Sequence, residues 1–444
     1  MSLQQNAKLM ICFILSLVAS VASAQSGVGI LASAKKRSLG QVNQLTQKQK
    51  VVLIIADGIP ADVIERLGPA ALGTIIKKGV YTRAYVGGKK GTYTETPTIS
   101  APGYMDMLTG TWAYKHHVLD NEDQHPNYHY PSIFGILKKE RPEARIGIFS
   151  TWLENRKTLL GAGLPETNNL HFDYAFDGYE KDSLRFVHDT ASLYLHHIDD
   201  FVVRCADSVI RKEGPDLSWV YLEYTDDVGH KMGTGKAFDK AVGLLDVQLS
   251  KIDSAIRYRE ANYPEKWLLI ITTDHGRDSI TGADHGNQSA RERTTWIVLN
   301  KKITNTYFKY GKVAMVDILP SVAAYMKIPL RPHVSDELDG TPFIGPVSLT
   351  NASVTSSSSP KGNQTRLTIR WKSFHPSEHI KLFISYTDNA QTGGIDKYTF
   401  LGSAFSGKEV FFHTVAGLHK QSFFKILLKG KYNAVSVRNA IVAR

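Results

Sequence analysis

Short runs of apolar residues, each followed by polar residues, recur along the first three quarters of the chain. Five of these runs are Val51–Ile55, Ile146–Phe149, Trp219–Tyr224, Trp267–Thr272 and Trp296–Leu299. Continuous apolar runs of this length predict strands that are buried on both faces of a sheet. Helical patterns lie between the runs, for example over Ala237–Tyr258. We therefore predict an α/β domain over residues 50–345, with a mostly parallel central sheet flanked by helices.

The pattern changes near Pro346, where the chain becomes rich in serine and turn residues. Beyond this point, short segments of alternating polarity are separated by turn residues. They are Arg366–Trp371, Lys381–Tyr386, Tyr398–Leu401, Val410–His413 and Phe423–Leu428. This spacing predicts a β-sandwich over residues 346–444, and its pattern resembles that of a fibronectin type III module. We expect this part to be an accessory domain.

The N-terminus has the features of a secretory signal. Lys8 precedes the apolar run Leu9–Val21, and Ala22-Ser23-Ala24 follows it. A short positive start, an apolar stretch and small residues predict a signal peptide over residues 1–24, cleaved after Ala24. The apolar run is too short to anchor the chain in a bilayer. We expect export to the periplasm or the extracellular space, with residues 25–49 as a flexible leader.

Composition adds two constraints to this picture. The chain has 444 residues and a net charge of +11, and from Ser348 onward it has 13 Lys/Arg against 4 Asp/Glu. The positive charge of the C-terminal domain would favour anionic surfaces such as lipid headgroups or glycans, although a solvated basic face is the simpler interpretation. The chain has no nucleic-acid-binding motif. Since Cys12 lies in the predicted signal, Cys205 is alone in the mature chain and no intrachain disulfide is expected.

Acidic and histidine side chains follow three of the predicted strands, at or near the point where each strand ends. They are Asp57, Asp226, His230, Asp274 and His275, with His285 ten residues after His275. Ligands of open α/β sheets bind at the carboxyl ends of the strands. Carboxylates together with imidazoles suit zinc, with manganese as the lesser alternative. Each motif alone is typical of a turn or a helix cap, but their combination after apolar strands predicts a metal site.

Ser100 lies between the first two of these strands. The Pro two residues later, Pro102, predicts that a helix begins at or next to Ser100. By itself Ser100 would be only a helix cap. Beside a metal site, however, the positive end of the helix and the metal would both stabilise the alkoxide form of the hydroxyl. They would also attract the negatively charged phosphoryl oxygens of a substrate. Ser100 is therefore the candidate nucleophile.

Six motifs between Val51 and about Phe343 point to a known group of enzymes. They are Asp57-Gly58, Thr98-x-Ser100-x-Pro102 with Leu108-Thr109-Gly110, His117-x-x-Asp120-Asn121, Asp226-x-x-x-His230, Asp274-His275-Gly276 and His285-Gly286. Together they resemble the alkaline phosphatase superfamily and, within it, the type I phosphodiesterase/nucleotide pyrophosphatase family.

The resemblance implies a two-metal phosphoric ester hydrolase. Its two zinc ions would be held by Asp226, His230 and His285 and by Asp57, Asp274 and His275. Ser100 would attack the phosphorus of a small-molecule phosphate ester and form a phospho-serine intermediate. Asn121 matches the asparagine that hydrogen-bonds a non-bridging phosphate oxygen in the family.

The chain departs from the family at residues that bear on the substrate. Ala101 stands where nucleotide-cleaving members have an aromatic residue that stacks on the base, so the nucleotide assignment is withheld. Tyr104 stands where sulfatases need an arginine, which argues against a sulfatase. Asn121 has no basic partner in its own segment, and this favours diesters over monoesters. Three basic residues elsewhere, Arg156, Lys157 and Arg277, leave a phosphomonoesterase or phosphonate hydrolase as the alternative.

Two further interpretations remain open from the sequence. The long, aromatic and His-rich range 122–215 is interpreted as a cap that shapes specificity. A non-catalytic surface-binding protein is the alternative of another class, and the six intact ligand positions argue against it.

Overall fold

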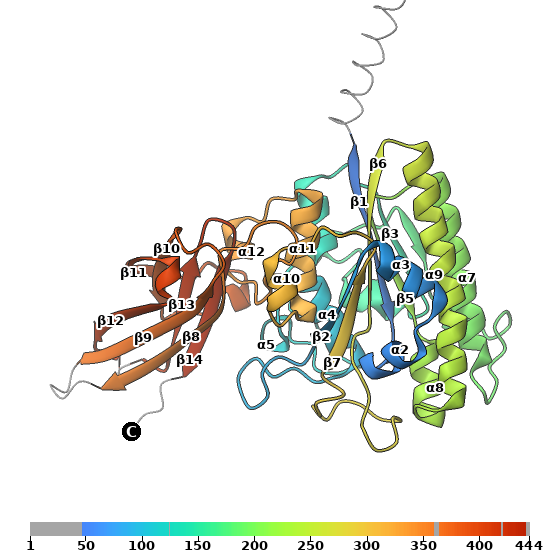
Figure 1. Cartoon of the computed structure of the whole chain (residues 1–444), viewed down its shortest axis with the longest axis horizontal. Helices are drawn as coiled ribbons and strands as arrows, with labels where there is room; N and C mark the ends of the chain where they lie inside the picture. Colours follow the sequence, from blue (N-terminus) through green and yellow to red (C-terminus); the bar gives the residue numbers. More distant parts are fainter. Residues whose placement is uncertain (1–46, 124, 359–363, 419–420, 441–444) are drawn as a thin grey trace, which may run out of the picture. The chain divides into compact units, whose positions relative to one another are not determined.

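The computed structural model describes residues 47–123, 125–358, 364–418 and 421–440 (Figure 1). The predicted signal and residues 25–46 of the predicted leader lie outside this range. Nearly all of the described residues belong to one compact unit, formed by Gln49–Ala261 and Trp267–Arg444. Within the described part of the chain, no helix is long and apolar enough to cross a membrane.

A seven-stranded sheet forms the centre of the α/β domain, with the order β2-β7-β6-β1-β5-β3-β4. Its strands are β1 (Lys48–Ala56), β2 (Val80–Tyr85), β3 (Ile146–Ser150), β4 (Tyr174–Phe176), β5 (Leu217–Leu222), β6 (Glu265–Thr272) and β7 (Thr294–Leu299). The pairs β1–β5, β5–β3 and β3–β4 are parallel, whereas β7 is antiparallel to β6 and to β2. The prediction of a mostly parallel sheet is confirmed, and all five predicted strands belong to it.

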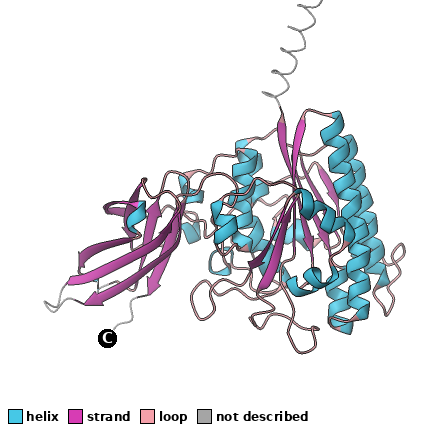
Figure 2. Cartoon of the chain, in the orientation of Figure 1, coloured by secondary structure: helices cyan, strands magenta, loops and turns pink. Residues whose placement is uncertain are grey.

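Helices cover both faces of this sheet (Figure 2). They are α2 (Ala61–Leu67), α3 (Ala70–Lys78), α4 (Ser100–Thr109), α5 (Ala113–His116), α6 (Ile133–Glu140), α7 (Leu193–Lys212), α8 (Tyr224–Met232), α9 (Lys236–Asn262), α10 (Thr306–Tyr310), α11 (Ile318–Met326) and α12 (Pro332–Ser335). Residues of α2, α3, α7 and α9 form one hydrophobic cluster with the sheet, and residues of α4, α6, α10 and α11 form the other.

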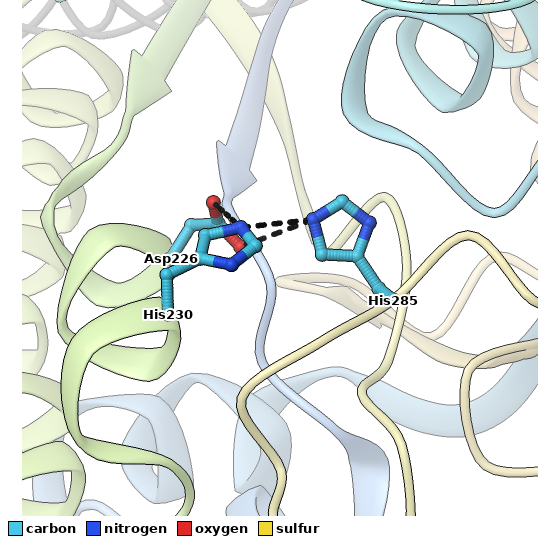
Figure 3. Close-up of side chains that lie close together, drawn as sticks. All are labelled: Asp226, His230 and His285. Carbon is cyan, nitrogen blue, oxygen red and sulfur yellow. Dashed lines mark hydrogen bonds and ion pairs between the residues drawn. The ribbon is translucent and has the colours of Figure 1, made fainter.

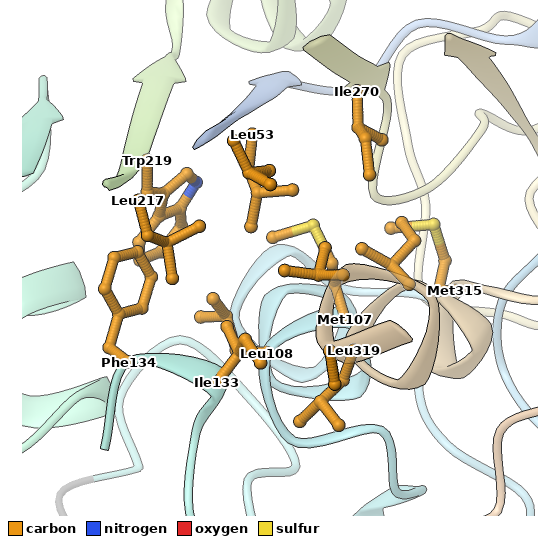
Figure 4. Packing of buried hydrophobic residues seen from close by; sticks show 14 of the residues in the cluster. Leu53, Met107, Leu108, Ile133, Phe134, Leu217, Trp219, Ile270, Met315 and Leu319 are labelled. Atoms are coloured by element: carbon orange, nitrogen blue, oxygen red, sulfur yellow. The ribbon is translucent and has the colours of Figure 1, made fainter. Parts of the chain in front are cut away.

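The alternation of side chains along β1 explains why the sheet is covered twice. Leu53 and Ile55 belong to the cluster of α4 and α11, while Val52 and Ile54 belong to that of α7 and α9. Successive side chains of a strand point to opposite faces, so a continuous apolar run requires a hydrophobic partner on each side. Figure 4 shows Leu108 of α4 among the residues of the cluster that α4 and α11 form with the sheet.

Two sequence predictions change in this part of the chain. The predicted strand Trp219–Tyr224 ends two residues earlier, because Tyr224 is the first residue of α8. The range 122–215 contributes α6, β3, β4 and α7 to the central sheet and its covering layers. The cap stays a prediction for the residues of the range outside these elements, chiefly numbers 151–192 between β3 and α7, apart from the short strand β4.

The C-terminal strands form two antiparallel sheets that share one hydrophobic cluster. They are β8 (Leu349–Ser358), β9 (Gln364–Ser373), β10 (His379–Ser385), β11 (Tyr398–Phe405), β12 (Val410–Ala416), β13 (Phe423–Lys429) and β14 (Ala434–Ala440). The sheet orders are β11-β10-β13-β14 and β12-β9-β8. The sequence prediction missed β8 and β14. Both are edge strands, and β8 is rich in Ser and Thr, so its apolar pattern is weak.

Candidate active site

The ends of β1, β5 and β6 bring the predicted ligands together. Asp57 directly follows β1, and its backbone N–H donates to Leu222 O over 3.1 Å. Asp226 lies in the first turn of α8, four residues beyond β5. Asp274 follows β6, and its Oδ1 accepts from Gly58 N over 3.2 Å. The sheet order β6-β1-β5 thus places the three carboxylates side by side.

Asp226, His230 and His285 form the first group of candidate ligands (Figure 3). His230 Nε2 lies 3.1 Å from Asp226 Oδ2 and 3.0 Å from His285 Nε2. The spacing of four residues places Asp226 and His230 on the same face of α8. His285 comes from the loop between β6 and β7, and its Nδ1 donates to Thr98 O over 2.9 Å. Because Nδ1 carries this proton, Nε2 presents a lone pair to the group.

Asp57, Asp274 and His275 form the second group. His275 Nε2 lies 3.5 Å from Asp57 Oδ1 and 3.2 Å from Asp274 Oδ2. Its Nδ1 donates to Gly276 O over 2.8 Å, so Nε2 again presents the lone pair. Asp57 Oδ1 and Asp274 Oδ2 are buried and have no hydrogen-bond partner. Buried carboxylate oxygens without partners are costly, and a divalent cation would satisfy both.

The electrostatics of the second group also suit a cation. Burial, and then the charges of Asp274 and Asp226, raise the pKa of Asp57 well above its usual value. Burial and Asp226 raise the pKa of Asp274 to about 7. Burial and the neighbouring His285 hold the pKa of His275 well below its usual value, so this ring is neutral and able to bind a metal. The residues present therefore fit a two-metal site.

Two tyrosines orient the Asp57 carboxylate. Tyr104 and Tyr221 both donate to Asp57 Oδ2, the latter over 2.7 Å. One oxygen is thus fixed by hydrogen bonds, and the other faces His275. Such hydrogen bonds behind a ligand fix its orientation toward the metal. They also give Tyr104, which replaces the arginine of sulfatases, a role inside the site.

Ser100 is the first residue of α4, and Ile99 is the N-cap. The prediction that a helix begins at or next to Ser100 is confirmed. The Oγ of Ser100 lies 3.3 Å from His275 Nε2, and Ser100 is 6% exposed. A Cβ on Gly103 would lie 3.0 Å from the backbone oxygen of Asp274. The glycine therefore allows α4 to approach the end of β6, which brings Ser100 next to the second group.

A cavity of about 200 Å³ lies in front of Ser100. Its lining consists of Asp57, Ser100, Tyr104, Asn121, Trp152, Tyr221, Glu223 and Asp226. Asn121 Oδ1 accepts from Ala101 N over 2.9 Å, so its amide group keeps two N–H donors for other partners. The structure thus places Ser100 and Asn121 at one cavity together with acids of both ligand groups.

Sequence reasoning missed three lining residues, Trp152, Tyr221 and Glu223. Trp152 follows the end of β3 by two residues, Tyr221 lies near the end of β5, and Glu223 directly follows β5. Applying the strand-end rule to the predicted strand Ile146–Phe149 would have found Trp152. Tyr221 and Glu223 had no such signal, because both lie inside the predicted strand Trp219–Tyr224.

Three basic residues had left a phosphomonoesterase as an alternative, because they could have bound the additional phosphate charge. None of them, Arg156, Lys157 or Arg277, lines the cavity. The Arg156 guanidinium donates to both oxygens of Asp177, over 2.5 and 2.8 Å. Arg277 is buried and contacts backbone oxygens and Asp226. Lys157 is exposed.

The family model for "Type I phosphodiesterase / nucleotide pyrophosphatase" matches residues 51–339, which is more than half of the chain. The chain belongs to this family. The family consists of hydrolases of the alkaline phosphatase superfamily, and the match spans every candidate ligand described above.

Comparison with known proteins places this family member among distant relatives. Two 2,3-bisphosphoglycerate-independent phosphoglycerate mutases, from Mycoplasma mobile and Mycoplasmopsis pulmonis, are 29% identical over 176 residues and 27% identical over 175 residues. Each match covers 38% of this chain, and the chain spans about a third of each mutase, 32% and 33%.

Solved structures resemble the fold. A putative sulfatase from Bacteroides thetaiotaomicron has a TM-score of 0.50 and 12% identity, with 74% of this chain and 82% of the other covered. Murine ectonucleotide pyrophosphatase/phosphodiesterase 5, inactive and in complex with AMP, has a TM-score of 0.45 and 14% identity, with 64% and 96% covered. At 12% identity the likeness to the putative sulfatase extends to the fold alone.

Proposed function

We propose that the chain hydrolyses phosphodiesters, with Ser100 as the nucleophile and zinc ions at the two ligand groups. The observation that carries the proposal is the position of Ser100. Its hydroxyl lies at the start of a buried helix, 3.3 Å from a ligand nitrogen, at a cavity that acids of both groups line. Manganese is the alternative metal, because the carboxylate ligands would accept it as well.

The reaction follows from the residues around the cavity. When bound, the two ions would lower the pKa of the Ser100 hydroxyl and stabilise the leaving oxygen. Ser100 Oγ would bond to phosphorus while the bond from phosphorus to the leaving alcohol breaks, and the ester bond of the phospho-serine would then be hydrolysed by water. The N–H groups of Asn121 would donate to a non-bridging oxygen as charge develops on it. His275 would act as a neutral ligand, because burial lowers its pKa.

The charge of the cavity favours a diester over a monoester. None of the lining residues is basic, and Glu223 adds an acid beyond the candidate ligands. A monoester dianion carries one more negative charge than a diester and would need an additional positive partner. Arg156 is paired with Asp177, so it does not supply that charge. The runner-up is a phosphomonoesterase or phosphonate hydrolase, and the similarity to the mutases favours the phosphomonoesterase, because phosphoglycerate is a phosphate monoester.

The organic part of the substrate would meet Trp152 from the predicted cap. Trp152 is half-buried, lines the cavity and packs edge-to-face with Tyr104, with ring centroids 6.5 Å apart. Ala101, in contrast, is fully buried and offers no surface for stacking on a base. We infer that Trp152 contacts an apolar or aromatic ester group and that the substrate need not be a nucleotide.

A substrate panel tests the proposed function. Zinc-loaded protein is assayed with bis(p-nitrophenyl) phosphate, p-nitrophenyl phosphate and p-nitrophenyl sulfate. We expect the highest kcat/KM for the diester and no sulfate hydrolysis. A higher value for the monoester would favour the runner-up. No hydrolysis together with a zinc content near zero would favour the non-catalytic alternative.

Replacing Asn121 with aspartate is expected to lower kcat for the diester by about 10²-fold, because a missing oxyanion donor has an effect of this size. The aspartate keeps the oxygen that accepts from Ala101 N but has no N–H group to donate. Zinc content should not change, since Asn121 belongs to neither ligand group. If N121D keeps the kcat of the wild type, Asn121 is not an oxyanion donor.

Two predictions concern parts of the chain outside the site. We infer that the protein is exported and that its signal is cleaved after Ala24. N-terminal sequencing of the exported protein would check this by finding Gln25 first.

We also propose that residues 346–444 form a fibronectin type III-like accessory domain, whose net positive charge favours contact with an anionic surface or a glycan. Salt-sensitive binding of the full chain to anionic vesicles would test that contact.

A further inference from the structure

Arg277 directly follows Asp274-His275-Gly276, and its side chain is 0% exposed. The proposed reaction gives it no role. A buried guanidinium is costly unless its five N–H groups find acceptors. The contacts of this side chain therefore indicate why an arginine occupies the position.

All three nitrogens of the guanidinium donate to segments that carry candidate ligands. Nε donates to Gly58 O over 3.1 Å, beside Asp57. Nη1 donates to Ala283 O over 2.7 Å, two residues before His285. Nη2 donates to the backbone oxygen of Asp226 over 2.6 Å and also to Asp226 Oδ1. One side chain thus links the segments that bear Asp57, Asp226 and His285.

The contact with Asp226 also determines which carboxylate oxygen is free. Oδ1 is held by Arg277, whereas Oδ2 faces His230 Nε2 over 3.1 Å. The carboxylate would therefore present a single oxygen to an ion at the first group.

The space around the guanidinium matches an arginine. A Cβ on Gly229 would overlap the guanidinium, and a Cβ on Gly58 would lie 3.1 Å from Arg277 Nη2. Gly58 also has φ +67°, a conformation that favours glycine. Two glycines thus leave room for a planar group. A lysine at this position would have three donors on one nitrogen and could not reach acceptors on three separate segments.

We propose that Arg277 is a positioning residue that holds the Asp226–His230–His285 group in a metal-binding arrangement and fixes it relative to Asp57. The inference rests on the proposed function, because it requires metal at the two groups. Since its N–H groups are used inside the protein, Arg277 does not bind the phosphate of the substrate.

The test measures zinc binding to the full chain by competition with a chelator, for the wild type and for Arg277→Lys and Arg277→Met. We expect one of the two zinc ions to bind about 10–100-fold more weakly in both variants, the usual effect of losing a partner behind a metal ligand. The visible spectrum of the cobalt(II)-loaded protein should change as well, because the coordination of one ion changes. Circular dichroism of the metal-free variants checks the fold.

Arg259→Lys is the matched control. Arg259 is also buried, 5% exposed, and donates to Arg211 O over 3.1 Å, and none of its contacts within the described part of the chain is with a candidate ligand. We expect R259K to lower thermal stability and to leave both zinc affinities and the cobalt spectrum unchanged. Wild-type zinc affinities and a wild-type cobalt spectrum in R277K would overturn the proposal, as would an equal loss of both ions in R277K and R259K. Wild-type protein that binds no zinc would overturn the proposed function itself.

Discussion

Replacing Ser100 with alanine is expected to reduce kcat for a phosphodiester by at least about 10³-fold, the scale of loss seen when a covalent nucleophile is removed. Ser100 belongs to neither ligand group, so the variant should still bind zinc. The helix should persist too, because Ser100 is not the N-cap and no capping hydrogen bond begins at Ile99. The loss would therefore be a loss of chemistry and not of structure.

Ser100→Thr provides the control for this prediction. It keeps a hydroxyl at the same position, so S100T should retain part of the activity. Steady-state kinetics with bis(p-nitrophenyl) phosphate, together with zinc content, compares the variants. Full activity in S100A would mean that water attacks the substrate directly and that Ser100 serves only as a structural residue of α4.

Removal of the metal is expected to lower the free energy of unfolding of the protein, by an amount that depends on pH. A zinc concentration 1,000 times the dissociation constant would stabilise the folded protein by about 4 kcal/mol relative to the metal-free form. We expect this difference to increase from pH 5 to pH 8, because Asp274, with a pKa of about 7, loses its proton over that range when no metal is bound.

The direction follows from the raised pKa values. In the metal-free protein Asp274 titrates at about 7, and in the unfolded chain it titrates near its ordinary value of 3.8. The folded state therefore binds an extra proton between these values, and the stability that this proton contributes is lost as the pH rises through 7. Asp57 shifts in the same direction. Zinc binds the deprotonated carboxylates, so its affinity increases over the same range.

Thermal unfolding of chelator-treated and zinc-loaded protein, measured across this pH range, checks the prediction. Asp199 and Asp317 also have pKa values raised to about 7, by burial in both cases, but they lie outside the ligand groups. Their titration would affect both forms of the protein equally and cancel in the difference. A stability difference that stays constant or decreases between pH 5 and pH 8 would contradict the assignment of Asp57 and Asp274 as ligands.

The sequence was sufficient to predict the central sheet and the clustering of the candidate ligands. The apolar runs are strong because each strand is buried on both faces, and parallel strands bring their carboxyl ends to one edge. Residues as far apart as Asp57 and His275 could therefore be expected at one site, while their division into two groups came from the resemblance to the family; the structure brings both groups together. The role of each as a ligand stays a prediction.

Other features depend on tertiary contacts that carry no local pattern. Arg277 is a charged residue in a loop, and only the positions of Gly58 and Gly229 show why its guanidinium is buried. The strands β8 and β14, two of the four edge strands of the C-terminal sheets, were missed because few of their side chains reach the shared cluster. The orientation of Asp57 by Tyr221 likewise requires knowledge of side-chain directions.

The central claim is that Ser100 attacks the phosphorus atom of a diester. Its most direct test is to quench zinc-loaded protein with acid during turnover of a phosphodiester and to analyse the peptide that contains Ser100 by mass spectrometry. We predict a phosphoryl adduct on Ser100 that still carries one ester group, present with the wild type and absent with S100A. An unmodified Ser100 peptide during rapid turnover, with excess diester present, would contradict the claim.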